Sequence, residues 1–188
     1  MSDKFLNKYR ISSTRLQNWD YRWAGAYFIT ICTKNREHYF GSITNSEMQL
    51  SGAGILADVF WHEIKNHSKN VELGNFVVMP NHVHGILILI GDVDTGHALY
   101  LPPQPPPQPP PPPKTIGQQR FQNVGKNSVS SIIGSYKSAV TKHAHRLGLD
   151  MEWQERFHDH IIRDDGEYQR ISKYIANNPQ KWESDSHK

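Results

Sequence analysis

Two histidines form the feature of this sequence whose residue type and spacing best fit a chemical role. His82 and His84 are two residues apart in a stretch typical of a β-strand, so both imidazoles point to the same face. Two neutral imidazoles that converge on one point are good ligands for a divalent cation. The alternative is a pair with one ring satisfied in the core and the other exposed, and the spacing alone does not separate the two.

The strand that would hold this pair is apolar on both faces after Gly85, from Ile86 to Ile90. Such a run predicts a central strand that is covered on both sides. The preceding segment, Val71 to Met79, is predicted to be its antiparallel partner, because Pro80 cannot donate to a sheet ladder and breaks the chain between them.

A tyrosine on a later helix is the candidate nucleophile. Ser128 is a plausible N-cap for a helix that runs to about Arg146, and Tyr136 lies in the middle of its apolar stripe, facing the sheet. A phenol beside a metal-bound phosphodiester can attack phosphorus and form a phosphotyrosine. The alternative for Tyr136 is a core aromatic ring whose hydroxyl lies at the rim.

The other predicted elements complete an α+β domain. They are a strand at 26–33, a hairpin at 39–50, a helix at about 52–65, and a last helix at about 167–177. The buried face of the helix at 52–65 is predicted to consist of Ile55, Val59, Ile64 and the aromatic pair Phe60 and Trp61. This order predicts an antiparallel sheet with helices packed on one face and a helical C-terminal tail.

Composition sets limits on the class of protein. The chain has 188 residues, a net charge of +3 and one cysteine, which excludes an internal disulfide and a cysteine-rich zinc site. No apolar run reaches the roughly 20 residues of a membrane helix, and the first residues lack a signal peptide, so we expect a cytoplasmic protein. Basic residues are concentrated before Phe40 and between Lys114 and Leu149, an arrangement that suits nucleic acid or a solvated face.

The predicted domain organisation has four parts: an arm at 1–22, one domain at 23–182, a proline-rich insert within it at 92–126, and a tail at 183–188. Ten of the twelve prolines lie between Pro102 and Pro113, which favours polyproline II. The insert is then a semi-rigid spacer or a ligand for an aromatic groove on a partner.

Several ordered motifs resemble one enzyme family. The stretch Met79-Pro80-Asn81-His82-Val83-His84 before an apolar strand resembles the HUH motif of the IS200/IS605-type single-tyrosine transposases, and within them the REP-associated tyrosine transposases. Further similar stretches are Tyr27 to Thr33, Ser135-Tyr136-Lys137-Ser138, Trp153 to Phe157, and Tyr174-Ile175-Ala176-Asn177-Asn178-Pro179.

The resemblance implies a ferredoxin-like (RRM-like) fold and a metal-dependent enzyme that cleaves single-stranded DNA near a hairpin. It implies a 5′-phosphotyrosine intermediate, a free 3′-OH, and Mg²⁺ or Mn²⁺ as cofactor. His82 and His84 match the metal-binding pair, and Tyr136 is taken as the nucleophile. Single-stranded or hairpin DNA is the expected partner, and the family contains homodimers and monomers, the latter with a C-terminal tail that covers the site.

One departure concerns the third metal ligand. In the family a polar residue follows the nucleophile by one helical turn, but Val140 holds that position after Tyr136. Asn81, Thr141, His143 and water remain open as replacements. DNA contacts are predicted for four basic residues: Arg22, Arg36, Lys137 and Lys142.

Two other functions compete with the nuclease. A domesticated protein that holds structured DNA without cutting it would explain Val140. An amidohydrolase also has a His-x-His strand, but its barrel needs eight β/α units and more metal ligands than this chain offers.

Overall fold

The structure is a computed structural model that describes residues 4–5, 8–9, 19–91 and 127–184. The predicted N-terminal arm up to residue 18, the proline-rich insert and residues 185–188 therefore lie almost wholly outside the described residues. The strands and helices are β1 (Lys4–Phe5), β2 (Lys8–Tyr9), β3 (Gly25–Cys32), β4 (Gly41–Thr44), β5 (Glu47–Leu50), α1 (Gly52–His67), β6 (Val71–Met79), β7 (His82–Leu89), α3 (Val129–Arg146), β8 (His158–Ile162) and α4 (Asp165–Ala176), with 3₁₀ turns η1 (Lys34–Arg36) and η2 (Pro179–Ser184).

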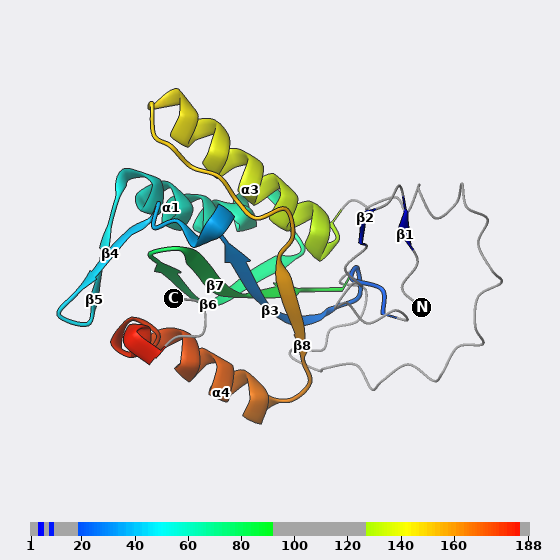
Figure 1. Cartoon of the computed structure of the whole chain (residues 1–188). Helices are drawn as coiled ribbons and strands as arrows, with labels where there is room; N and C mark the ends of the chain where they lie inside the picture. The colour runs from blue at the N-terminus through cyan, green and yellow to red at the C-terminus, as the bar shows by residue number, and fades with distance from the viewer. Residues whose placement is uncertain (1–3, 6–7, 10–18, 92–126, 185–188) are drawn as a thin grey trace.

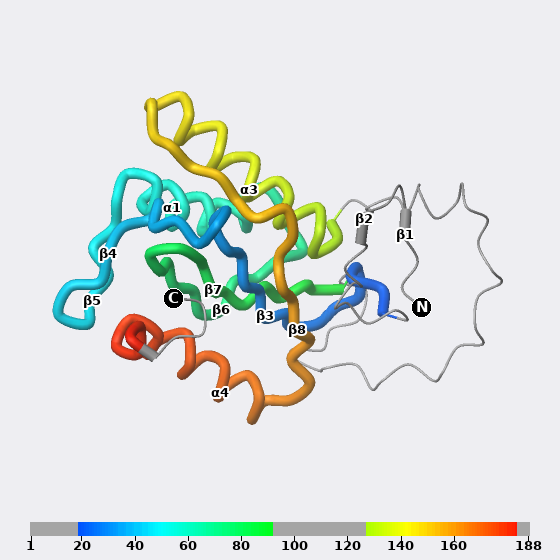
Figure 2. The backbone as a smooth tube through the Cα atoms, in the orientation of Figure 1, coloured from blue at the N-terminus to red at the C-terminus, as the bar shows by residue number. Residues whose placement is uncertain are grey.

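The core of the molecule is a four-stranded antiparallel sheet in the order β6-β7-β3-β8. Together with α1 and α3 it gives the order β3-α1-β6-β7-α3-β8, which is the ferredoxin-like arrangement. Figure 2 traces the backbone as it returns from the end of α3 to β8 beside β3. The predicted fold class is confirmed.

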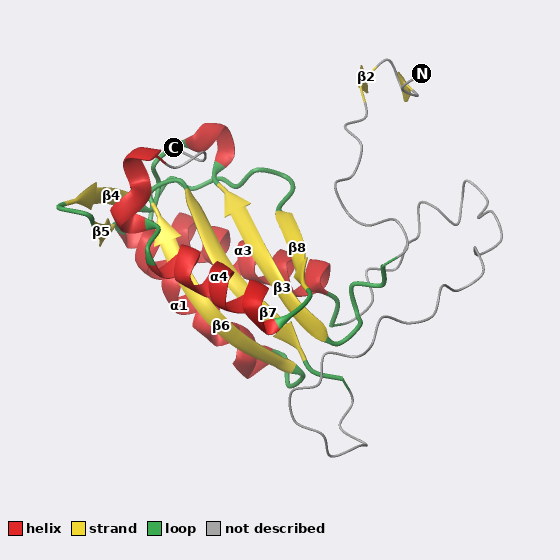
Figure 3. Ribbon diagram, turned by 90° about the horizontal axis from the view of Figure 1, so that it is seen from below, coloured by secondary structure: helices red, strands yellow, loops and turns green. Residues whose placement is uncertain are grey.

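Two layers of helix enclose this sheet. Helices α1 and α3 pack on one face, and α4 crosses the opposite face, as Figures 1 and 3 show from two directions. We call these the α1/α3 face and the α4 face. The predicted C-terminal helical tail is thus α4, and it covers the side of the sheet that the other helices leave open.

The alternation of β7 decides which face each of its side chains meets. Val83, Leu87 and Leu89 belong to the core cluster under α1 and α3, whereas Ile86 and Ile88 pack with Ile162, Ile171 and Ile175 beneath α4. The predicted central strand, covered on both sides, is confirmed. Because His82 and His84 alternate in step with Ile86, their imidazoles lie on the α4 face.

Gly85 follows His84 in β7 and faces the α1/α3 side of the sheet, where there is no room for a side chain. A Cβ atom built at Gly85 would lie 2.3 Å from Cζ2 of Trp61, whose ring is fully buried under the strand. Trp61 stacks on Phe76 at a centroid distance of 4.6 Å. The glycine therefore lets a large aromatic pair press directly against the backbone that carries the histidines.

The helix boundaries follow from capping, and the structure corrects the predicted buried face of α1. Ser51 and Ser128 accept hydrogen bonds from Gly54 N and Ser131 N, as expected for N-caps. However, Ile55 and Val59 are 52% and 47% exposed. The side of α1 that meets the core is made of Ala53, Gly54, Ala57, Trp61 and Ile64, because small residues allow the helix to approach closely and leave room for Trp61.

Strand β8 was not predicted from the sequence. The segment His158–Ile162 pairs with β3 through Thr30↔His158 and Phe28↔His160, so it forms the fourth strand and an edge of the sheet. Within the described ranges, no helix has the length and apolar character needed to cross a membrane.

Candidate active site

The two histidines form a buried pair at the start of β7, on the α4 face. Their ring centroids are 4.5 Å apart, and both side chains are almost completely shielded from solvent. Neighbouring strands hold them on either side, with Cys32 and Met79 opposite His82, and Thr30 and Val77 opposite His84. The predicted convergence of the two imidazoles on one side of the strand is confirmed.

Hydrogen bonds fix the orientation of both rings. His82 Nδ1 lies 2.8 Å from Asn81 Oδ1, and because an amide oxygen only accepts, this nitrogen carries the proton. His84 Nδ1 lies 2.8 Å from Thr30 Oγ1. With the proton on Nδ1, His82 presents the lone pair of Nε2, and His84 does the same when Thr30 accepts from its Nδ1. This arrangement, with Nδ1–H held by a neighbour, is typical of metal-binding histidines.

Tyr174 on α4 is the tyrosine that meets the histidine pair. Its hydroxyl lies 3.2 Å from His84 Nε2 and donates to it in the tautomer just described. The ring packs edge-on to His84 at 5.3 Å and to Phe28 at 6.1 Å. Tyr174 is 39% exposed, so part of this residue is open to solvent while its hydroxyl contacts the pair.

Asn178 follows Tyr174 by four residues and lies in the turn between α4 and η2. Its amide is buried, and its Oδ1 has no hydrogen-bond partner within the described ranges. Trp182, four residues further along in η2, places its ring 6.2 Å from His82. Asn178 thus lies in the chain between two residues that both contact the histidine pair.

These residues fit the divalent metal that the family resemblance implies. A buried amide oxygen with no partner and two oriented imidazole nitrogens are donors that Mg²⁺ or Mn²⁺ accepts. The described residues contain no group of three or more His, Cys, Asp and Glu side chains that could bind a metal. Such a site would use His82 and His84, with the buried Asn178 oxygen as the candidate third ligand.

The predicted meeting of Tyr136 with the histidines is wrong. Tyr136 faces the sheet as expected, but it belongs to the core of the α1/α3 face, on the other side of the sheet from His82 and His84. It is 3% exposed, and its hydroxyl donates to the carbonyl of Ala57 at 2.9 Å. Burial, followed by the charge of Asp58, raises the pKa of this phenol well above its ordinary value, which opposes a nucleophilic role.

The candidates for a third ligand on α3 fail for the same reason. Thr141 donates to Met151 Sδ, and His143 packs against Phe60 of α1, so neither approaches the histidine pair. Asn81 does contact His82, but as the acceptor that orients the ring. Val140 is fully buried in the core of the α1/α3 face.

The four basic residues predicted to contact DNA are dispersed. Arg22 precedes β3 and pairs with Asp20, whereas Arg36 follows the far end of that strand. Lys137 donates to the carbonyls of Gln154 and Glu155, and Lys142 is exposed on α3, across the sheet from the histidines. The structure does not bring the four together, and their role in DNA binding stays a prediction.

Comparison with known proteins places the chain in a family. No protein-family model matches it. An uncharacterized protein from Haemophilus influenzae is 37% identical over 174 residues, which is 92% of this chain and 90% of that protein. This chain and the Haemophilus protein belong to one family.

The fold of that family is shared with a transposase of known structure. A REP-associated tyrosine transposase bound to a REP hairpin superposes with a TM-score of 0.55 and 22% identity, covering 92% of this chain and 74% of that chain. The predicted resemblance to the single-tyrosine transposases is therefore confirmed at the level of the fold.

The sequence contained a signal for Tyr174 that the choice of Tyr136 overlooked. The absence of a polar residue at Val140 was already a departure from the pattern, whereas Tyr174 has Asn178 at the required distance. In the structure Asn178 comes after the end of α4, so the spacing alone does not place its side chain on the Tyr174 side of the helix. The stretch from Tyr174 to Pro179, already similar to the family, was the signal that the sequence offered.

Proposed function

We propose that this protein is a metal-dependent single-tyrosine enzyme that cleaves and rejoins single-stranded DNA, with Tyr174 as the nucleophile. The observation that carries the proposal is the 3.2 Å contact between the Tyr174 hydroxyl and His84 Nε2, within a buried histidine pair. It replaces Tyr136 as the assignment. The shared fold with a transposase supports the same reaction class.

The reaction proposed for Tyr174 is a phosphoryl transfer. The phenol oxygen attacks phosphorus, the bond from phosphorus to the 3′ oxygen breaks, and a 5′-phosphotyrosine forms. The phenol proton leaves to solvent, and the 3′ oxygen takes a proton to become a free 3′-OH. Rejoining is the reverse: a 3′-OH attacks the phosphotyrosine and restores the Tyr174 hydroxyl.

His82, His84 and Asn178 would hold the divalent cation, with Thr30 and Asn81 keeping the two rings in their orientation. When bound, Mg²⁺ or Mn²⁺ polarises a phosphodiester oxygen and neutralises the charge that builds up on it. The chain contributes a phenol held at the pair by the fold of α4, so the nucleophile needs little reorganisation to meet a bound phosphate.

The substrate proposed is a single strand that flanks a DNA hairpin. The structural neighbour is described as bound to a REP hairpin, and an enzyme with the same fold and a similar motif order would act on DNA of that kind. A test uses hairpin oligonucleotides taken from the DNA beside the coding region, each with single-stranded flanks.

The test is the formation of a covalent adduct. Purified protein with Mn²⁺ and such an oligonucleotide is expected to give a protein–DNA band that survives denaturing electrophoresis. Tyr174→Phe should lose at least about a thousandfold of this product, because no other group replaces the nucleophile. Tyr136→Phe, the matched control, should keep it. Loss of the adduct in Tyr136→Phe alone would overturn the assignment.

A protein that binds structured DNA without cutting it was the alternative. The absence of a polar residue after Tyr136 was the feature that supported it, and Tyr174 with Asn178 removes that support. A mobility shift with hairpin DNA, with no adduct under any divalent metal, would restore this alternative.

A further inference from the structure

The α4 face has a part that α4 does not cover. The helix packs mainly against β6 and β7, and Figure 3 shows the ends of β3 and β8 beyond it. Strand β8 pairs with β3 alone among the described strands, so this region also borders the edge of the sheet. We call it the open corner, and it consists of Phe28, Thr30, His158 and His160 on the sheet, with Arg170 and Tyr174 on α4.

The register of β3 and β8 places the ring side chains of the open corner on the face of the histidine pair. His158 is opposite Thr30, and His160 is opposite Phe28. Thr30 in turn is opposite His84, to which it is hydrogen-bonded. Cross-strand partners point to the same face, so His158 and His160 lie on the α4 face, two strands away from the pair.

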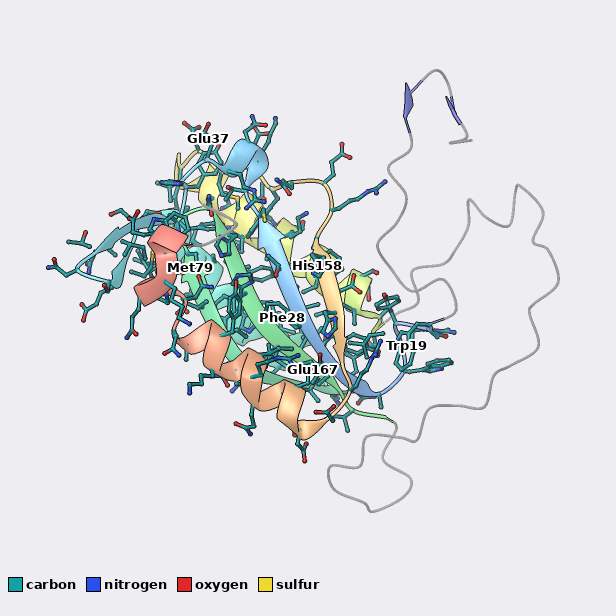
Figure 4. All side chains as sticks on the ribbon, turned by 60° about the horizontal axis from the view of Figure 1, so that its bottom comes forward. Trp19, Phe28, Glu37, Met79, His158 and Glu167 are labelled. Atoms are coloured by element: carbon teal, nitrogen blue, oxygen red, sulfur yellow. The ribbon has the colours of Figure 1, made fainter. Side chains whose placement is uncertain are left out.

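Rings line the floor of the open corner. Phe28 is half-buried, and its ring lies 5.2 Å from His84 and 6.1 Å from Tyr174. His158 is exposed at the start of β8, further from α4, as Figure 4 shows with both residues labelled. An unpaired base has two flat faces and stacks on such rings, whereas a base inside a duplex cannot reach them.

Positive charge lies along the wall that α4 provides. Arg170 is one helical turn before Tyr174, and its side chain is 74% exposed. Its guanidinium contacts Glu167 Oε1 at 3.1 Å, and His160 Nε2 contacts the same oxygen at 2.8 Å. The Glu167 carboxylate is thus shared between Arg170 and His160. Its contact with Arg170 keeps the guanidinium on the side of α4 that borders β8.

We infer that the open corner is the binding surface for the unpaired DNA strand that carries the scissile phosphate. A nucleotide next to that phosphate stacks over Phe28 and His158, and a neighbouring phosphate contacts Arg170. This inference rests on the proposed function, because the strand is assigned to the surface that leads to Tyr174. The strand thus reaches Tyr174 from the side of β8, and Phe28, His158 and Arg170 bind it.

The experiment measures binding without cleavage. Every variant in this experiment also carries Tyr174→Phe, so that no strand is cleaved. The probe is a fluorescent oligo(dT) of about 12 nucleotides, which is within the site size of a single-stranded DNA-binding domain. Fluorescence anisotropy gives the affinity over a range of salt concentrations. His158→Ala should weaken binding by about tenfold, and Arg170→Gln should lower the slope of log affinity against log salt by about one.

Matched controls lie on the α1/α3 face. Arg146 and His67 are exposed there, and Arg146→Gln and His67→Ala should leave both affinity and slope unchanged. A fall in slope with Arg146→Gln, but none with Arg170→Gln, would overturn the inference and place the strand over α3. Unchanged binding in both His158→Ala and Arg170→Gln would overturn it as well.

The two proposals fail in different ways. If Tyr174 forms the adduct but the open-corner variants bind like their parent, the strand enters elsewhere and the proposed enzyme stands. If those variants lose binding and no adduct forms with Mn²⁺, the open corner is a DNA-binding surface and the proposed cleavage is wrong.

Discussion

Each face of the sheet is covered by a helix that carries a tyrosine, Tyr136 on α3 and Tyr174 on α4, and the surroundings of the two side chains differ. Tyr136, on the α1/α3 face, is enclosed by the rings of Trp61 and Trp153 and donates to a backbone carbonyl. Tyr174, on the α4 face, is partly exposed and is hydrogen-bonded to His84. The first tyrosine is a structural residue, and the second has the surroundings of a reactive one.

The two faces of the sheet also differ in how much hydrophobic core they contain. The α1/α3 face holds the larger hydrophobic cluster, which includes Trp61, Tyr27 and Phe40. The smaller cluster under α4 contains four fully or nearly buried residues, all isoleucines, with partly buried apolar residues such as Phe28 and Ile88 around them, and the same face carries the histidine pair. One strand, β7, faces both environments, so its backbone transmits the rigidity of the core to the histidine pair.

The largest stability effect is expected at the strand that the faces share. Gly85→Ala would place a methyl group against the ring of Trp61, and we expect a loss of about 2–3 kcal/mol in the free energy of unfolding. Gly134→Ala is the control, because nothing lies within 4 Å of a Cβ there, and it should stabilise α3 by up to about 1 kcal/mol. Urea denaturation measures both, and equal stability of the two variants would show that β7 is not pressed against Trp61.

The next effect concerns the α4 face. Thr30→Val removes the hydroxyl that orients His84, and we expect about tenfold weaker Mn²⁺ binding with little change in stability. Titration calorimetry measures the affinity directly, without DNA. Thr141→Val, a matched change on α3, should leave Mn²⁺ affinity as it was, and a loss in that variant would contradict the assignment of the metal to the α4 face.

Replacing each of the two tyrosines by phenylalanine should change the free energy of unfolding by different amounts. Tyr136→Phe loses a buried hydrogen bond to Ala57, and we expect a cost of about 1 kcal/mol. Tyr174→Phe loses only a bond at a partly exposed position and should cost less than about 0.5 kcal/mol. Thermal denaturation of the pair decides the point, since a larger loss in Tyr174→Phe would mean that this hydroxyl is mainly structural.

The smallest effect is expected at Glu167, at the edge of the α4 face. A hydrogen bond from the Arg163 backbone N–H, followed by one from His160, lowers the pKa of this carboxyl from 4.5. A lowered pKa stabilises the fold above pH 4.5, and that contribution disappears as the pH falls through the folded-state pKa. The difference in melting temperature between the wild type and Glu167→Gln should therefore be present at pH 7 and vanish in acid. A difference that grows in acid would show the opposite linkage.

The sequence predicted most of the framework because the framework is local. The caps at Ser51 and Ser128 and the break at Pro80 each act within a few residues, and all three are found in the structure. Strand β8 was missed because the segment His158–Ile162 mixes polar and apolar residues and lacks the apolar run of a central strand. It lies at the edge of the sheet, where it pairs with one strand only and polar side chains are tolerated.

The face on which a helix packs is not a local property, and this is where the predicted site went wrong. Periodicity showed that Tyr136 points toward the sheet, but both faces of β7 are apolar, and the pattern cannot say which one α3 covers. The same limit applies to Ile55 and Val59, whose exposure depends on how closely α1 approaches Trp61. The position of His82 and His84 on one face was predicted correctly, because the alternation of one strand places them together without reference to any helix.

The bond between Tyr174 and His84 also has a consequence for the proposed metal site. The His84 nitrogen that contacts the phenol is one of the two nitrogens proposed to hold the ion, and its lone pair serves one partner at a time. An ion bound at that nitrogen would therefore displace its contact with the Tyr174 hydroxyl. In the proposed enzyme, metal binding and release of the phenol from His84 would be a single event.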